Sequence, residues 1–389
     1  MVSLLSAMGV NPESATKTDA VIDGINVRAY TIPTDGPDGK EADGTLEWDS
    51  TTIVVVEVEA GNCVGLGYTY SDVAAAKLIE SKLAGRLKGK NPMSVPAIWH
   101  ELNAQLRNSG RPGIGAMALS AVDVALWDLK ARLVNLPLYQ MLGPFHEAVP
   151  VYGSGGFCNY PLDRLVQQVT HWAEQGIPRI KIKTSRFPDQ DPERIAACRS
   201  AIGDQALLMT DANGALSRKE ALYWAWRFRE DWWAAWMEEP VSSDDRTGLR
   251  QVRTQGPPGL DIAAGEYGYG LSDFAALLED QSVDCLQADV TRCGGITGLL
   301  QVTGLCSAYS IDLSAHCAPA ISAHAFCGVE RLRHLEYFHD HVRIESMLFE
   351  GTLAPTGGRL TPDHGRPGLG LKLKEQDAEQ YCVFRSSNR

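Results

Sequence analysis

The stretch RIKIKT, residues 179–184, is the first of seven that each carry an ionisable residue at or near the end of a short apolar run. The seven residues are Lys183, Asp211, Glu238, Glu266, Asp289, His316 and Glu336, separated by 28, 27, 28, 23, 27 and 20 positions. One strand followed by one helix has about this length. A (β/α)₈ barrel gathers the carboxyl ends of its strands around one pocket, so residues one unit apart become neighbours there. The spacing therefore predicts a barrel with a single acid/base site.

Strand-like and helix-like patterns alternate on both sides of this stretch. We expect strands at VPVYGSGG, RIKIKT, ALLMTDAN, WAAWMEE, LDIAAGE, CLQADV, DLSAH and RHLEYF. Seven helical stretches lie between them, and an eighth helix after the last strand has the weakest pattern. Residues 141–350 are therefore expected to form an α/β fold, a (β/α)₈ TIM barrel.

A different pattern precedes the barrel. Residues 20–67 alternate with a period of two, which predicts antiparallel strands, and residues 71–138 have helical spacing. We expect residues 1–140 to form a small α+β domain. Within it, the loop PTDGPDGKEADG (about 32–45) is predicted to be mobile and, with TYSD at 69–72, to close over the pocket. The Gly/Pro-rich residues 351–389 are expected to return to this domain.

Composition narrows the possible partners. The chain has 389 residues, with 36 basic and 48 acidic side chains and a net charge of -12, which disfavours nucleic acid and anionic membrane surfaces. Nine cysteines without a CxxC pair predict reduced core thiols in a cytoplasmic protein. The first residues carry no basic side chain before Lys17, and no apolar run is long enough to span a bilayer. We expect neither export nor a membrane span.

Three acids suggest a metal site. Asp211 in TDAN, Glu238 in MEEP and Glu266 in AGE each end a predicted strand. Any one of them alone would more often be a solvated carboxylate or a helix cap, but three in successive units favour a shared ligand. Carboxylate oxygens with room for water suit Mg²⁺, whereas Zn²⁺ prefers histidine and cysteine ligands.

The remaining ionisable residues suggest acid/base chemistry. Alternation along the strand places Lys181 and Lys183 on one side, facing the barrel axis. Two ammonium groups close to a divalent cation are expected to lower each other's pKa, so that one can act as a base. Asp289 and His316 are predicted to form a dyad that provides a second acid/base on the far side of the ring. The alternatives are solvent-facing lysines and a histidine of the core.

These motifs together resemble the enolase superfamily, and within it the mandelate racemase subgroup. The resemblance rests on KIK at 181–183, TDAN at 210–213, EEP at 238–240, GE at 265–266, DVTRCGGIT at 289–297 and SAH at 314–316, and it covers nearly the whole chain. It implies a modified barrel with an N-terminal α+β capping domain. It also implies Asp211, Glu238 and Glu266 as Mg²⁺ ligands, with Glu239 beside them but not a ligand.

The resemblance further assigns expected roles in the reaction. Lys183, supported by Lys181, would be one base, and His316 with Asp289 the other. Glu336 would hydrogen-bond the carboxylate of a small-molecule substrate, which requires it to be protonated or shielded by the metal. By analogy with barrel enzymes that have capping domains, we expect a homo-oligomer.

The implied chemistry is removal of the proton α to a carboxylate, giving an enediolate stabilised by Mg²⁺ and Lys181. Loss of a β-hydroxyl then dehydrates an acid sugar, and this is favoured because the lid segments are polar. Return of the proton to the opposite face is the alternative, a racemase or epimerase. Asp289 stands where cycloisomerase and dipeptide-epimerase relatives have lysine, and the lysine pair disfavours enolase itself. A metal-binding barrel without turnover is the third possibility.

Overall fold

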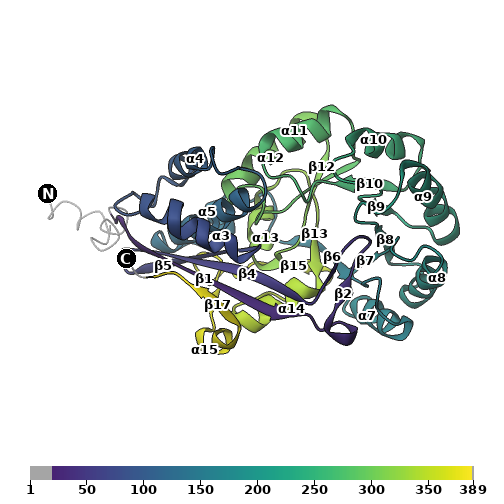
Figure 1. The fold of residues 1–389 in the computed structure, drawn as a ribbon, viewed down its shortest axis with the longest axis horizontal. Helices are drawn as coiled ribbons and strands as arrows, with labels where there is room; N and C mark the ends of the chain where they lie inside the picture. The colour runs from purple at the N-terminus through teal and green to yellow at the C-terminus, as the bar shows by residue number, and fades with distance from the viewer. Residues whose placement is uncertain (1–19, 388–389) are drawn as a thin grey trace.

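The computed structural model describes residues 20–387, so the expectations for the first 19 residues lie outside the described part of the chain. Eight parallel strands lie at the centre of the larger part of the molecule (Figure 1). They are β6 (Val149–Gly155), β7 (Arg179–Lys183), β8 (Leu207–Asp211), β9 (Trp236–Glu238), β10 (Asp261–Ala264), β11 (Cys285–Ala288), β12 (Asp312–Ala315) and β13 (Leu332–Phe338). Each pairs with the next in sequence, and β13 pairs with β6. The predicted barrel is confirmed.

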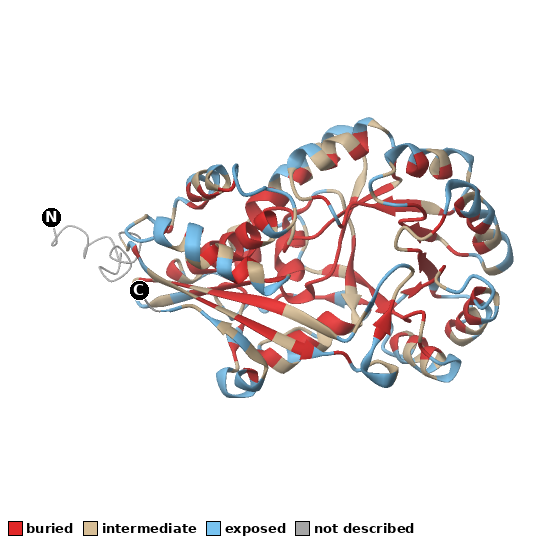
Figure 2. Ribbon diagram, in the orientation of Figure 1, coloured by how far each residue is buried: buried red, intermediate tan, exposed pale blue. Residues whose placement is uncertain are grey.

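Helices surround these strands. They are α7 (Leu162–Glu174), α8 (Asp191–Ile202), α9 (Arg218–Trp232), α10 (Arg246–Gln255), α11 (Leu271–Glu279), α12 (Gly295–Tyr309), α13 (Pro319–Ala325), the short turn η4 (Phe326–Gly328) and α14 (His339–Leu348). The strands are mostly buried, and the exposed residues lie on the outward faces of the helices (Figure 2). No helix within residues 20–387 combines the length and apolar character needed to cross a membrane.

Strand register explains why the sequence spacing converges on one site. Lys183 lies opposite Asp211, and Asp211 lies opposite Glu238. The ends of β7, β8 and β9 are therefore level, and their last side chains share one rim. The interior of the barrel is filled by a small cluster of buried residues that is separate from the main hydrophobic core: Tyr152, Met209, Trp236, Ala263 and Cys285.

The N-terminal domain is built on an antiparallel sheet. Its strands are β1 (Ile22–Pro33), β4 (Ser50–Ala60), β5 (Cys63–Tyr70) and, from the other end of the chain, β17 (Cys382–Arg385). Helix α5 (Ile114–Leu133) packs closely on β5. A Cβ atom on Gly67 would lie 2.3 Å from the backbone oxygen of Ala121, so glycine permits this contact. The other elements are α3 (Val73–Leu78), η2 (Ile79–Leu83), η3 (Ala84–Arg86), α4 (Val95–Gln105) and α6 (Leu138–Met141).

The segment predicted as a long loop contains regular structure. It holds the turn η1 (Pro37–Gly39) and a short hairpin of β2 (Glu41–Ala42) and β3 (Glu47–Trp48). The barrel orders it: the Asn159 side chain donates to the Lys40 carbonyl and accepts from the Ala42 N–H, each at 3.0 Å. Sequence composition did not reveal these contacts with the other domain.

The C-terminal residues link the two parts of the molecule. Strand β15 (Arg359–Leu360) pairs with β6 of the barrel, and β17 extends the N-terminal sheet beside β1. Between them, β16 (Lys372–Leu373) pairs with β14 (Phe349–Glu350), followed by α15 (Glu375–Ala378) and η5 (Glu379–Tyr381). All nine cysteines are free, and seven are buried.

Candidate active site

Three carboxylates meet at the ends of successive strands. Asp211 ends β8, Glu238 ends β9, and Glu266 follows β10. One oxygen from each lies within 4.8 Å of the others, and all three residues are buried. Glu266 Oε2 has no hydrogen-bond partner among the described residues, so it is available to bind a cation. An oxygen-only set of this kind fits Mg²⁺.

The backbone before Glu266 depends on a glycine. Gly265 has φ +134°, and a Cβ there would lie 2.2 Å from the backbone oxygen of Gln287. This explains the GE motif. Glu239, next to Glu238, does not belong to the carboxylate group. Burial and the neighbouring Glu266 raise the pKa of Glu239 well above its usual value.

Both lysines of the KIK motif lie among these acids. Lys181 Nζ is 2.5 Å from Glu238 Oε1, 2.8 Å from Glu336 Oε1 and 3.3 Å from Asp211 Oδ2. Lys183 Nζ is 2.6 Å from Asp211 Oδ2. Lys181 is fully buried and Lys183 almost so. The lysines therefore face the barrel axis, as the alternation predicted.

The lowering of the lysine pKa values was predicted for a site that holds a divalent cation, and without the metal the net shift of both lysines is upward. Burial lowers the pKa of Lys183, and Lys181 lowers it further, but Asp211, Glu336 and Glu266 outweigh both and raise it. Burial likewise opposes a rise for Lys181, yet Glu238 and Glu336 hold its pKa well above the usual value. The mutual effect of the two ammonium groups exists, but the surrounding carboxylates are stronger.

Asp289 and His316 form the expected hydrogen-bonded pair. His316 Nδ1 lies 2.8 Å from Asp289 Oδ2, and the other carboxylate oxygen accepts from the N–H and hydroxyl of Thr291, each at 2.7 Å. This arrangement fixes the proton on Nδ1 and turns Nε2 toward the cavity. Burial alone would lower the pKa of His316, but Glu266, Glu336 and Asp289 raise it.

Replacing Asp289 by Asn should lower the pKa of His316, because it removes one of the anions that favour the imidazolium. A raised pKa stabilises the metal-free fold below the unfolded-state pKa of about 6.5, and this contribution disappears as pH rises through the folded-state value. The stability difference between wild type and variant should therefore shrink at high pH. An NMR titration of the imidazole measures the pKa directly. An unchanged pKa would contradict this account of the dyad.

Glu336 faces Lys181 rather than solvent. Its Oε1 accepts from Ser154 Oγ at 2.6 Å and from Lys181, and its Oε2 lies 3.6 Å from His316 Nε2. Burial works to raise the pKa of Glu336, but Lys181, His316 and Lys183 lower it well below its usual value. We expected this acid to be protonated or shielded by the metal where it faces an anion, and in the metal-free structure it is ionised. Its charge is neutralised by neighbouring cations.

Two residues of the site escaped sequence reasoning. Arg292 Nη1 lies 3.4 Å from Glu266 Oε1, and its Nε lies 3.5 Å from Asp289 Oδ2, so it connects the carboxylate group with the dyad. In the sequence, the position of Arg292 three residues after Asp289 was the signal that could have indicated a place in the site. Cys317 Sγ lies 3.4 Å from His316 Nε2. Cysteine directly after a candidate base was a signal that could have been used.

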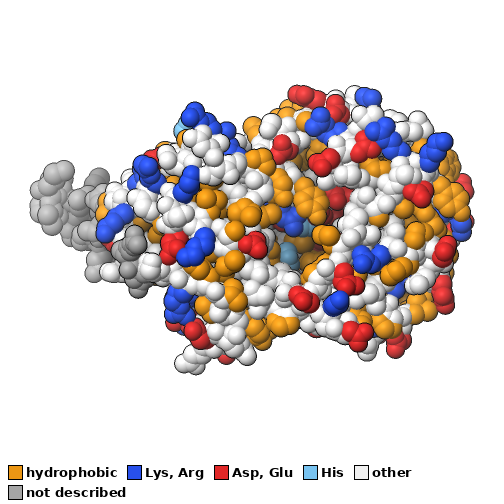
Figure 3. All heavy atoms as spheres, viewed as in Figure 1, with side chains coloured by type: hydrophobic (Ala, Val, Ile, Leu, Met, Phe, Trp, Pro, Cys, Tyr) orange, Lys and Arg blue, Asp and Glu red, His pale blue; other side chains and the backbone are white. Residues whose placement is uncertain are grey.

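A cavity of about 290 Å³ between the two domains is lined by six of the residues described above: Lys183, Glu266, Arg292, His316, Cys317 and Glu336. The N-terminal domain contributes Asp43, Trp48, Tyr70 and Ser71, so both predicted lid segments reach it. A hollow over the centre of the barrel, with acidic, basic and histidine atoms inside, is visible in Figure 3.

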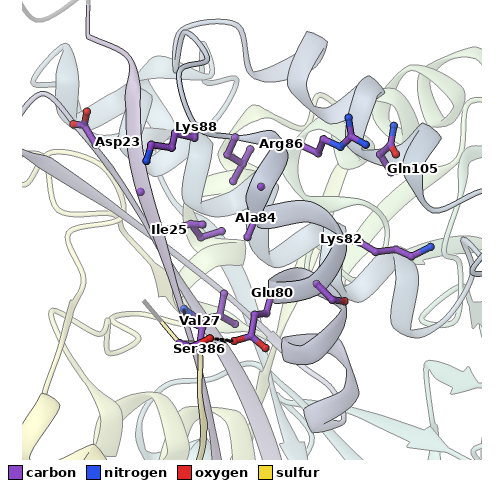
Figure 4. Close-up of a pocket in the computed structure, with 15 residues that line it drawn as sticks. Asp23, Ile25, Val27, Glu80, Lys82, Ala84, Arg86, Lys88, Gln105 and Ser386 are labelled. Carbon is purple, nitrogen blue, oxygen red and sulfur yellow. Dashed lines mark hydrogen bonds between the residues drawn. The ribbon is translucent and has the colours of Figure 1, made fainter. Parts of the chain in front are cut away.

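A larger cavity, about 860 Å³, lies in the N-terminal domain between β1 and the η2–η3 turns (Figure 4). Its charged side chains, such as Lys82, Arg86 and Lys88, are spread along its edge and do not converge on one point. The acid/base groups gather in the smaller cavity, which is therefore the candidate active site.

Two family models together match most of the chain. Residues 40–143 match the family model "Mandelate racemase / muconate lactonizing enzyme, N-terminal domain", and residues 164–378 match "Enolase C-terminal domain-like". The chain is 30% identical to an L-talarate/galactarate dehydratase of Salmonella typhimurium, over 95% of this chain and 93% of that protein. It is 31% identical to a 3,6-anhydro-alpha-L-galactonate cycloisomerase of Streptomyces coelicolor, over 91% and 97%.

Solved structures show the same fold. A mandelate racemase/muconate lactonizing enzyme-like protein from Rubrobacter xylanophilus has a TM-score of 0.91 and 57% identity, covering 93% of this chain and all of that one. The Salmonella dehydratase, crystallised with Mg and L-lyxarohydroxamate, has a TM-score of 0.85 at 28% identity and 95% coverage of each chain.

Proposed function

Because the chain belongs to the enolase superfamily, in its mandelate racemase/muconate lactonizing enzyme subgroup, we propose that it removes the proton α to a carboxylate and dehydrates an acid sugar to a 2-keto-3-deoxy acid. One observation carries the proposal. Lys183 and His316, from different sides of the barrel, line one cavity together with Glu266 of the carboxylate group.

The side chains of the site have different roles in this reaction. Magnesium held by Asp211, Glu238 and Glu266 would supply positive charge that stabilises an enediolate. Lys183 takes the α proton on one face. It acts as a base only when neutral, and a cation held by Asp211 would weaken the attraction of that carboxylate for the ammonium group and so favour the neutral form. Lys181, a fixed buried cation, stabilises negative charge that develops beside it.

On the other face, His316 holds a proton at Nε2 when it is charged. Asp289 keeps the ring in position by accepting from Nδ1. This proton can be given to a departing β-hydroxyl, which completes dehydration. If His316 instead gives this proton to the α carbon, the reaction is racemisation or epimerisation. The opposed placement of Lys183 and His316 makes that second function the alternative candidate.

The distant end of the cavity indicates the kind of substrate. Asp43, Ser50, Thr51 and Asp340 line it, whereas the cationic side chains of the cavity, Lys183, Arg292 and His316, belong to the barrel end. Burial lowers the pKa of His341 to about 3, which keeps that ring uncharged. Hydroxyls and carboxylates suit a neutral polyhydroxy tail better than a second carboxylate. We therefore favour a monocarboxylic acid sugar.

An assay with a library of acid sugars tests the proposal. Purified protein with Mg²⁺ is incubated with mono- and diacid sugars, and 2-keto-3-deoxy products are detected with semicarbazide. We expect product from at least one monoacid, and none after chelation of the metal. Conversion of an optically pure 2-hydroxy acid to its epimer without keto product would instead support the racemase alternative.

A further inference from the structure

A second set of donor atoms faces the same cavity. His316 Nε2, Cys317 Sγ and a Glu336 oxygen lie within 4.8 Å of one another, and all three residues are buried. Sγ is 3.4 Å from His316 Nε2 and 3.3 Å from Glu336 Oε2, and the last two atoms are 3.6 Å apart. The set differs in chemistry from the oxygen-only group of Asp211, Glu238 and Glu266.

These separations match a tetrahedral zinc site. With zinc bonds of about 2.3 Å to sulfur and about 2.0–2.1 Å to nitrogen or oxygen, tetrahedral angles place ligand atoms about 3.3–3.6 Å apart. The expected separations are about 3.6 Å for the pairs with sulfur and about 3.3 Å for nitrogen and oxygen. The measured values of 3.4, 3.3 and 3.6 Å each lie within about 0.3 Å of these, a shift that small side-chain movements supply on binding. The protein offers one nitrogen, one sulfur and one oxygen ligand, and the adjacent cavity can supply a fourth. This is the arrangement of an open zinc-type site.

Each donor is held in place by a neighbour. Asp289 accepts from the other nitrogen of His316, and Lys181 binds the other oxygen of Glu336. Cys317 has φ 51°, in the left-handed region, and its carbonyl accepts from Ser322 Oγ at 2.8 Å. Supporting contacts of this kind orient metal ligands and strengthen binding.

Space for an ion and its fourth ligand lies on the cavity side. His316, Cys317 and Glu336 all line the cavity of about 290 Å³. Glu266 Oε2 is 3.3 Å from His316 Nε2 and has no hydrogen-bond partner among residues 20–387, so an unpaired acceptor points at the same space. Water or a substrate hydroxyl can complete the tetrahedron.

We propose that His316, Cys317 and Glu336 form an inhibitory site for a thiophilic divalent cation of the zinc type, separate from the magnesium ligands. Binding forms bonds from the ion to Cys317 Sγ and to His316 Nε2, as the thiol proton and, where the imidazole is charged, the Nε2 proton leave to solvent. The ion is then bound to His316 Nε2 and Glu336 Oε2. These are the atoms that would face substrate, so the bound ion prevents them from acting on it. The inhibition rests on the proposed function, whereas the binding does not.

The buried thiol resists ionisation by itself. Burial, with Glu336 and Asp289, raises the pKa of Cys317 well above its usual value. A coordinated divalent cation overcomes this, because a metal-bound thiol is deprotonated outright. The cation also compensates the negative charge of Glu336.

Cobalt(II) provides the direct test of binding. It is added to the full-length protein saturated with Mg²⁺, so that the oxygen-only group is filled. We expect one equivalent to give the strong near-ultraviolet absorption of cobalt–thiolate bonds, which oxygen ligands do not give. Cys317→Ser and Cys317→Ala should abolish it, whereas Cys382→Ser, a partly buried cysteine of β17, should not. No band in wild type, or a band that survives in both Cys317 variants, would overturn the proposal.

Inhibition is measured with zinc on any acid that the enzyme turns over, with each variant compared with its own zinc-free rate. Loss of a direct ligand should raise the zinc concentration needed for half-inhibition by more than the roughly 10–100-fold that supporting residues contribute. Equal sensitivity of wild type and Cys317→Ser would overturn the inhibitory role. If no acid is turned over, the proposed function fails, and the cobalt band still decides whether the site exists.

Discussion

Replacing His316 by Asn should lower turnover by about 10²–10⁴-fold, the usual contribution of a positioned general acid or base. Asn keeps a polar group of similar size but cannot hold or release a proton. Lys183→Met should cause a loss of the same order, because it removes the base on the opposite face. Rates of keto-acid formation at saturating Mg²⁺ measure both effects.

Matched controls separate this loss from general damage. His171→Asn and Lys219→Met change the same residue types at exposed positions on α7 and α9 and should leave the rate unchanged. Each active-site variant should retain Mg²⁺ binding, since neither residue is a ligand in this account. A His316→Asn enzyme with more than a tenth of wild-type activity would contradict the assigned role.

The second large effect concerns stability. Replacing Lys181 by Met should destabilise the metal-free protein by about 3–5 kcal/mol, the cost of leaving buried charges uncompensated. Lys181 is fully buried and contacts Glu238, Glu336 and Asp211. Methionine has a similar length, so packing changes little and the electrostatic loss dominates.

Magnesium should then restore part of the stability, because an ion held by Asp211 and Glu238 would compensate two of the three buried carboxylates that lose Lys181. The rise in unfolding temperature on Mg²⁺ addition should be larger for Lys181→Met than for wild type. Unfolding curves with chelator and with saturating Mg²⁺ test this, with Lys219→Met as the neutral control. A deficit below about 1 kcal/mol without metal, or one that Mg²⁺ does not change, would contradict the electrostatic role.

The sequence predicted the barrel and the convergence of its strand-end residues because both follow from a regular period. Parallel strands end level, as the pairing of Lys183 with Asp211 and of Asp211 with Glu238 shows. The dyad could be predicted for the same reason, since Asp289 and His316 follow adjacent strands, β11 and β12.

Other features depend on local geometry that a period does not contain. In a regular strand, Cys317 would point away from His316. The left-handed backbone at Cys317 places its thiol in the same cavity. Arg292 reaches Glu266 and Asp289 through the turn after β11, whose path the sequence does not reveal.

Charge states were the least predictable property. Pairing two lysines suggested lowered pKa values, but the outcome depends on how many carboxylates lie within contact distance of each ammonium group. Asp211, Glu238 and Glu336 surround Lys181, and this arrangement also keeps Glu336 ionised. Only the folded arrangement shows which of these opposing effects is larger.

Loss of the α proton is the central claim, and proton NMR in D₂O measures it most directly. The Mg²⁺-loaded protein is incubated with the acid-sugar library and with aromatic 2-hydroxy acids, and the signal of the proton next to the carboxylate is followed. We expect this signal to disappear from at least one acid with wild type, through exchange or conversion, and to persist when both Lys183→Met and His316→Asn are present. Undiminished signals from every acid with metal-loaded wild type would contradict the claim.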